Sequence, residues 1–236
     1  MDITKAVSSF RFRVSSAQGP RFKATGNGRR GLWVVLLGPD GAGKSSVIEG
    51  LGSGVAAGFA GCETYHLRPS FLRCKRARAP NCNPHGRAAR GALISTIKLV
   101  YLLAANWLGY LRVVRPRLSR GTLVLFDRYF PDCLVDPVRY RLPRSCRRLT
   151  ELVAAMIPQP DLCVVLDAPA DALWERKHEV SRAETERQRS TYAVLGSKFR
   201  NVTVVDAARA LPEVVNDVIE RIIERHLAYH GRFELA

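Results

Sequence analysis

A short glycine-rich stretch, Gly38-Pro39-Asp40-Gly41-Ala42-Gly43-Lys44-Ser45, constrains this chain more than any other feature. It follows a continuous apolar run from Leu32 to Leu37, and a helical pattern begins at about Lys44. An apolar run that ends at a glycine is typical of a strand buried on both faces of a parallel sheet. Strand, glycine-rich turn and helix, in this order, form the setting in which GxxxxGK[ST] cradles phosphate groups.

The residue types of this motif suit a nucleoside triphosphate. Glycines let the backbone bend so that successive N–H groups face the phosphates, and the following helix adds its positive end. Lys44 is expected to reach the β- and γ-phosphates, and the Ser45 hydroxyl to ligate Mg²⁺, so ATP and Mg²⁺ are the expected cofactors. The expected nucleotide contacts in this segment are Gly38, Asp40, Gly41, Ala42, Gly43, Lys44, Ser45 and Ser46.

Further apolar runs alternate with helical patterns. The expected strands are Glu63–Leu67, Thr122–Phe126, Asp161–Leu166 and Val202–Val205, and helices are expected near 45–57, 92–117, 147–157, 170–192 and 212–229. Strands that alternate with helices predict right-handed βαβ units. The fold class is therefore α/β, a three-layer P-loop NTPase domain.

The chain is strongly basic, with 37 Lys and Arg against 21 Asp and Glu, a formal net charge of +16. Such a surface attracts nucleotides, nucleic acid or acidic membrane, although a diffuse solvated surface has the same composition. Residues 1–30 are expected to be a flexible basic extension and residues 31–236 the folded domain. Residues 68–90 read as a basic, proline-containing insert after the second strand, on the side where the substrate that accepts a phosphoryl group would bind.

Cysteine usage and hydropathy indicate the compartment. The six cysteines contain no CxxC pair, which favours reduced thiols. The most apolar stretch, 92–114, is interrupted by Lys98, Asn106 and Arg112, and so favours a buried or half-buried helix over a membrane span. Because the N-terminus lacks the apolar block of a secretory signal, we expect a cytoplasmic protein.

Several segments, taken in order, resemble thymidylate kinases. The loop reads Asp-Gly-Ala-Gly-Lys-Ser, Asp127-Arg128-Tyr129 follows a strand, and Pro160–Leu162 leads to Leu166-Asp167-Ala168-Pro169 and an arginine-rich helix. The resemblance covers residues 31–229. It implies a five-stranded parallel sheet in the order 2-3-1-4-5, a helical lid at about 174–192, and ATP-dependent phosphoryl transfer to a nucleoside monophosphate such as dTMP. It also implies a homodimer.

The resemblance implies roles for single residues near the phosphates. Asp127 would lie near Mg²⁺ and the reacting phosphates, and Arg128 would clamp the phosphoryl group of the acceptor. Asp40 is expected to contact both the nucleotide and the acceptor. Arg209, which follows the last strand, lies in a stretch that resembles the adenine loop of the family. A structural ion pair at a strand end is the alternative for Asp127 and Arg128.

The lid is expected to supply a catalytic cation, because position 42 in the loop is alanine. By resemblance, the candidates for this cation are Arg176, Arg182 and Arg187, with Arg189 behind them. An arginine in this role stabilises the transferring phosphoryl group. A solvated helix with Glu–Arg pairs would read the same way.

The acceptor side departs from the family pattern. In thymidylate kinases an Arg-Glu-Pro-Gly-Gly-Thr stretch follows the second strand, and here only Arg68-Pro69 keeps part of it. On the next helix Leu103 and Trp107 replace the Phe and Arg that contact thymine, so Trp107 either stacks on a ring or packs in the core. We therefore expect an altered base pocket. Two alternatives stay open: a kinase for a sugar or lipid-linked metabolite, and a nucleotide-binding switch that holds nucleic acid or membrane.

Overall fold

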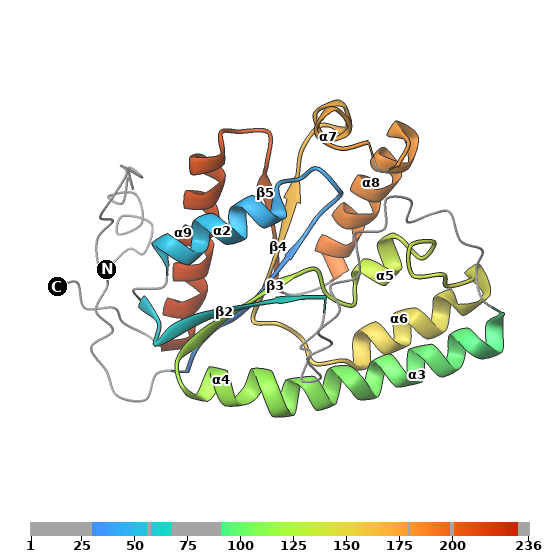
Figure 1. Cartoon of the computed structure of the whole chain (residues 1–236), viewed down its shortest axis with the longest axis horizontal. Helices are drawn as coiled ribbons and strands as arrows, with labels where there is room; N and C mark the ends of the chain where they lie inside the picture. The colour runs from blue at the N-terminus through green and yellow to red at the C-terminus, as the bar shows by residue number, and fades with distance from the viewer. Residues whose placement is uncertain (1–29, 56–57, 68–90, 179, 199–200, 231–236) are drawn as a thin grey trace, which may run out of the picture.

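A parallel sheet with helices on both faces organises the chain (Figure 1). The computed structural model describes residues 30–55, 58–67, 91–178, 180–198 and 201–230. The strands are β1 (Trp33–Leu37), β2 (Gly61–His66), β3 (Thr122–Asp127), β4 (Leu162–Asp167) and β5 (Val202–Asp206). All neighbouring strands are parallel, and their order is β2-β3-β1-β4-β5. The predicted fold class and strand order are therefore confirmed.

The central strand β1 separates two hydrophobic cores. Side chains alternate across a strand, so Val34 and Leu36 enter one core while Val35 and Leu37 enter the other. All four side chains are buried. This explains why the sequence shows a continuous apolar run rather than an alternating one.

Each face of the sheet has its own helices. Helices α2 (Lys44–Gly54) and α9 (Leu211–His230) pack together on one face (Figure 1). The other face carries α3 (Ala92–Gly109), a π-helical turn (Tyr110–Val114) and α4 (Arg115–Ser119), together with α6 (Arg147–Met156). Two short elements that the sequence did not predict, α5 (Asp132–Val135) and a 3₁₀ turn (Arg144–Cys146), lie before α6.

The helices α3 and α4, joined by the π-helical turn, form one helical segment, Ala92–Ser119. By length and composition this segment could cross a membrane, with a mean hydropathy of 1.4 in its most apolar window. Only 22% of that window is buried. The segment is thus half-buried at most, which is one of the two possibilities that the sequence left open.

The predicted single helix over 170–192 is two helices, α7 (Ala170–Arg176) and α8 (Arg182–Lys198). The backbone becomes extended at Lys177, and Ser181 then caps α8 by accepting a hydrogen bond from the Glu184 N–H at 3.3 Å. Serine is a favoured N-cap, because its hydroxyl satisfies an N–H that has no partner within the helix. The charge pattern alone did not reveal this break.

The residues just before β1 are held by contacts near the start of β4. Arg30 forms an ion pair with Asp161 at 3.0 Å, and the other carboxylate oxygen of Asp161 accepts a hydrogen bond from the Trp33 N–H. These contacts hold the start of β1 against the start of β4. The expected extension up to residue 29, the insert 68–90 and its Arg68 lie outside the described residues.

Candidate active site

The glycine-rich loop follows β1 directly and lies between β4 and α7. A side chain at Gly38 would come within 2.4 Å of the Leu166 carbonyl oxygen, and one at Gly41 within 2.5 Å of the Leu173 carbonyl oxygen. Both glycines also have positive φ angles, of 143° and 85°. Only glycine meets both requirements, since it has no Cβ and tolerates φ > 0. The loop therefore has the backbone shape that the motif predicts.

Lys44 lies buried inside this loop. Its Nζ donates hydrogen bonds to the carbonyl oxygens of Gly38 and Pro39, at 2.8 and 2.7 Å. Burial and the nearby charge of Arg128 together lower the pKa of Lys44 to about 8, although Asp40 opposes the shift. A buried ammonium with a lowered pKa gains strongly from an anionic ligand, because the ligand offsets its desolvation.

The residues present fit a magnesium nucleotide. Asp127 ends β3 opposite Leu36, so its carboxylate lies beside the start of the loop. One carboxylate oxygen of Asp127 is 3.3 Å from His66 Nδ1, and the other is buried without a hydrogen-bond partner among the described residues. Ser45 is exposed on the first turn of α2. A buried carboxylate oxygen without a partner and a nearby hydroxyl are suitable ligands for Mg²⁺.

The charge state of Asp127 agrees with this role. Burial raises the pKa of its carboxyl group, but the hydrogen bond with His66 and the charges of Lys44 and Arg128 outweigh burial. The net effect is a lowered pKa. The group is therefore ionised at neutral pH, as a metal ligand must be.

Arg128 joins the glycine-rich loop to α5. Its guanidinium donates to Asp132 Oδ2 at 2.7 Å and also pairs with Asp40 of the loop. Burial lowers the pKa of Arg128, but the charges of Asp132 and Asp40 outweigh it and raise the pKa overall. Arg128 adopts a left-handed backbone with φ of 68°, which is strained for arginine. The two carboxylates hold its side chain beside the phosphate loop.

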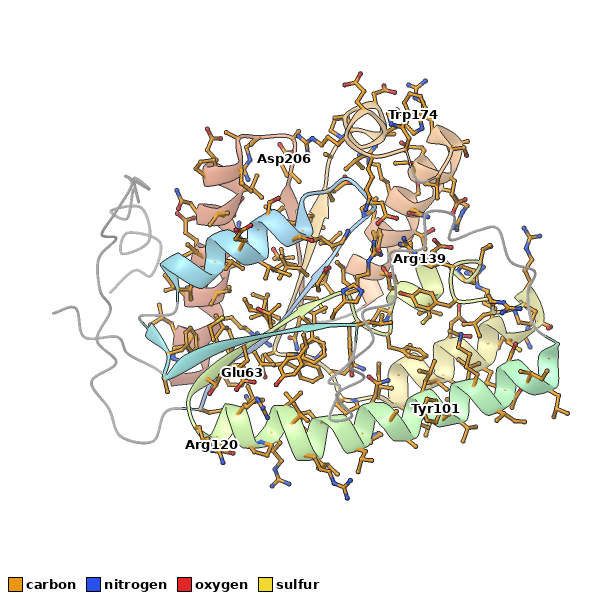
Figure 2. The ribbon with its side chains drawn as sticks, viewed as in Figure 1. Glu63, Tyr101, Arg120, Arg139, Trp174 and Asp206 are labelled. Atoms are coloured by element: carbon orange, nitrogen blue, oxygen red, sulfur yellow. The ribbon has the colours of Figure 1, made fainter. Side chains whose placement is uncertain are left out.

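A second arginine reaches the same loop residue. Arg139 Nη1 lies 3.0 Å from Asp40 Oδ2, so Asp40 lies between two guanidinium groups. Figure 2 labels Arg139, which lies in the segment between α5 and the 3₁₀ turn. This contact with the phosphate loop makes Arg139 a candidate for binding the acceptor.

Asp132 is a fully buried carboxylate at which three elements meet. Its Oδ2 accepts hydrogen bonds from Arg128 and, at 2.9 Å, from Tyr140, and its Oδ1 accepts one from Tyr192 of α8. Burial and the charge of Asp132 raise the pKa of both tyrosines well above the usual value. Asp132 therefore links the lid helix to Arg128, a connection that the sequence did not predict.

We expect Asp132→Asn to destabilise the fold by about 3 kcal/mol, because an amide removes one charge from a buried ion pair. The –NH₂ group of the new asparagine would also face Arg128, Tyr140 or Tyr192, which all donate hydrogen bonds to Asp132 in the wild type. Urea unfolding measures this change. The control is Asp171→Asn, which removes an exposed ion pair with Arg182 and should cost less than about 1 kcal/mol. Equal stability of the two variants would contradict the role of Asp132.

The lid arginines face different parts of the site. Arg176 donates to the Ala207 carbonyl oxygen at 3.0 Å, in the loop after β5, and Arg182 pairs with the exposed Asp171. Arg187 pairs with Glu184 and donates to the Val135 carbonyl oxygen at the end of α5. These contacts bring Arg187 toward the acceptor side and leave Arg182 on the outer surface.

Arg189 has the most specific contact of the lid arginines. Its guanidinium meets Asp167, at the end of β4, with two hydrogen bonds of 2.8 and 3.0 Å. A two-bond contact of this kind fixes an arginine well. Arg189 was predicted only as a secondary candidate, behind the other lid arginines. The signal that could have identified it is Asp167, at the end of the adjacent strand β4.

Two further predicted residues lie outside this cluster. Arg209 pairs with Asp217 at 2.5 Å and lies in the loop after β5, as expected for the adenine side. The Trp107 indole donates to the Met156 carbonyl oxygen on α6 at 3.0 Å, and no interaction in the described part of the chain joins it to the phosphate loop. The preceding residue, Asn106, is buried on the inner side of α3. The contact of Trp107 with an acceptor stays a prediction.

Taken together, the parallel sheet, the phosphate loop and the arginine-rich lid define a P-loop nucleotide kinase. Comparisons with known proteins agree, although no family model matches the chain. A probable thymidylate kinase of Caldivirga maquilingensis is 27% identical over 208 residues, which cover 82% of this chain and 94% of the relative. A thymidylate kinase of Synechococcus sp. is 29% identical over 215 residues, with 84% and 99% covered.

Solved structures show the same fold. The thymidylate kinase of Candida albicans aligns with a TM-score of 0.60 at 14% identity, over 84% of this chain and 94% of the other. That of Ehrlichia chaffeensis aligns with a TM-score of 0.54 at 14% identity, over 81% and 98%. The chain is thus similar to thymidylate kinases, and it is an ATP-dependent nucleotide kinase of the P-loop type that uses Mg²⁺.

Proposed function

We propose that the enzyme transfers the γ-phosphoryl group of ATP to a phosphorylated acceptor held beside Arg128 and Arg139. The observation that carries this proposal is the position of Arg128, fixed by Asp40 of the phosphate loop and by the buried Asp132. A cation fixed between donor and acceptor can neutralise charge as the phosphoryl group moves, without rearrangement. The default acceptor is a nucleoside monophosphate, of which dTMP is one.

The proposed mechanism relies on positioning. Lys44 and the loop N–H groups bind the β- and γ-phosphates, while Arg128 orients the phosphoryl group of the acceptor. When bound, Mg²⁺ supplies charge that neutralises the phosphates, and Ser45 and Asp127 are the residues that would hold it. Closure of α7 and α8 would exclude water and bring in a lid arginine. Arg187 and Arg189 are better supported in that role than Arg182, whose contacts are at the outer surface.

A sugar or lipid-linked acceptor is the second candidate. Leu103 packs against the sheet core and Trp107 is held by α6, so neither supplies the directional contact that a base would need. A site without such a contact discriminates poorly between bases. The cytoplasmic location stays a proposal, supported by four free cysteines among the described residues. The homodimer stays a prediction.

A panel of acceptors tests the proposal. We expect ADP release with at least one nucleoside monophosphate to exceed the ATPase background at least about tenfold, with dTMP favoured over other bases by less than about tenfold. Sugar phosphates and phosphate-bearing lipids form the second arm. Turnover with these compounds alone would replace the nucleotide acceptor by the second candidate. Strict selectivity for dTMP would contradict the altered base pocket.

A further inference from the structure

The inner face of the lid helix α8 is polar where a packed helix is usually apolar. Thr185, Gln188, Tyr192 and Leu195 recur at helical spacing, and each is at most 6% exposed. Of these four side chains only that of Leu195 has no polar atom. Helices of a globular domain normally hold to their neighbours by a stripe of apolar side chains. The position of α8 therefore depends strongly on hydrogen bonds to the residues that it contacts.

Two of these polar side chains donate hydrogen bonds to α5 and to the residue directly after it. Tyr192 donates to Asp132, and Gln188 donates to Asp136 at 3.3 Å. Figure 1 shows α8 beside α5, and the two helices are in contact. Asp132 is also the carboxylate that pairs with Arg128. The lid helix is thus attached to a residue that holds Arg128 in place.

The two carboxylate oxygens of Asp132 have different partners. Oδ2 accepts hydrogen bonds from Arg128, at 2.7 Å, and from Tyr140, at 2.9 Å, whereas Oδ1 accepts one from Tyr192. The outer torsion of an aspartate is soft, so a carboxylate with partners on one oxygen only can still turn about it. A donor on the second oxygen restricts this rotation. The Tyr192 hydroxyl therefore helps to fix where Oδ2 lies, and with it the guanidinium of Arg128.

We propose that Tyr192 is a positioning residue, which through Asp132 holds Arg128 in the place for phosphoryl transfer only while α8 is docked on α5. This role rests on the proposed function, in which Arg128 orients the phosphoryl group of the acceptor, and it adds how closure of the lid is communicated to that arginine. A displacement of about 1 Å in a positioned group can lower a rate about 10²-fold. One hydroxyl group of the lid can thus affect turnover without touching either substrate.

Tyr140 provides a matched control, because its hydroxyl donates to the same carboxylate from outside the lid. It lies in the segment between α5 and the 3₁₀ turn. Tyr140→Phe and Tyr192→Phe each remove one hydroxyl donor to Asp132 and keep the aromatic ring. If Asp132 only needs donors to stabilise the fold, the two variants should have equal effects. Only Tyr192→Phe removes a connection to α8.

Steady-state kinetics compare the two variants at saturating MgATP, with the acceptor that the wild type uses fastest and dTMP as the first choice. We expect Tyr192→Phe to lower kcat at least about tenfold, with the affinity for MgATP close to that of the wild type. The loss from Tyr140→Phe should stay within about threefold. In Tyr192→Phe a larger share of the ADP should come from hydrolysis, because a lid that docks less well admits water. Thermal unfolding verifies that both variants fold.

Hydrogen exchange of the ligand-free proteins tests the link between α8 and Asp132 without any substrate. Amides of α8 should exchange at least about tenfold faster in Tyr192→Phe than in the wild type, because loss of the hydrogen bond favours local opening of the helix. Tyr140→Phe should leave the exchange of α8 at the wild-type rate.

Equal losses of kcat in the two variants, or a normal kcat in Tyr192→Phe, would overturn the positioning role. Unchanged exchange of α8 in Tyr192→Phe would overturn it as well, because the hydroxyl would then not hold the lid. A wild-type enzyme that transfers phosphate to no acceptor would overturn the proposed function and the positioning role with it, while faster exchange in Tyr192→Phe would still establish the contact between α8 and Asp132.

Discussion

Arg128→Ala is expected to lower turnover at least about 10³-fold, while the affinity for MgATP stays close to that of the wild type. Arg128 lies between Asp40 and Asp132, where the transferring phosphoryl group needs a fixed cation. Its removal leaves Asp132 with two tyrosine donors and Asp40 with Arg139, so the fold should survive. Steady-state ADP release and calorimetric ATP titration measure the two effects separately.

Two variants sharpen this test. Arg147→Ala removes an exposed arginine that pairs with Glu151 on α6, and its turnover should be unchanged. Arg128→Lys keeps the charge but loses the fork that reaches two carboxylates, so its turnover should fall between those of the alanine variant and the wild type. Normal turnover of Arg128→Ala would show that Arg128 is a structural ion-pair residue.

Lys44→Ala is the second large effect, and here both turnover and ATP affinity should fall. We expect turnover at least about 10³-fold lower, because Lys44 carries the charge that binds the β- and γ-phosphates. Weakened ATP binding distinguishes this variant from Arg128→Ala. Retained nucleotide affinity in Lys44→Ala would contradict the assignment of the loop.

The pH dependence of stability offers an independent test of Lys44. Its pKa is about 8 in the folded protein and 10.5 for an ordinary lysine, so between these values the unfolded chain holds more protons. The free energy of unfolding of the wild type should therefore rise relative to that of Lys44→Ala as pH increases through this window. Below pH 8 Lys44 is charged in the folded wild type, and the desolvation of its buried ammonium lowers the free energy of unfolding of the wild type relative to that of the variant. Parallel pH profiles of the two proteins would indicate an unshifted lysine.

Local pattern and order along the chain predicted the strands closely. The apolar run before Gly38 is β1, and the other four strands lie within about two residues of their predicted positions. The strands could be predicted because the sequence signals of a buried strand and of a glycine turn lie within a few consecutive residues. The strand order came from the resemblance and is confirmed.

Contacts between distant elements could not be predicted in the same way. Tyr192 and Asp132 are 60 residues apart, and no local pattern connects a lid tyrosine with a carboxylate after β3. The lid is divided into two helices between Lys177 and Ser181, where Ser181 caps α8, and the charge pattern of the segment did not indicate this cap. Trp107 stands where thymidylate kinases have an arginine that contacts the base, yet its indole N–H donates to a carbonyl oxygen of α6. Tertiary packing decided each of these cases.

Calorimetric titration of the wild-type protein with ATP and excess Mg²⁺ tests the central claim most directly. We predict one nucleotide per chain, with a Kd between about 1 μM and 1 mM, the range common for enzyme substrates. Binding at about pH 9 should take up protons from the buffer, because the phosphates restore the charge of Lys44, whose pKa is about 8 in the free protein. The absence of binding by any purine triphosphate in the presence of Mg²⁺ would contradict the account.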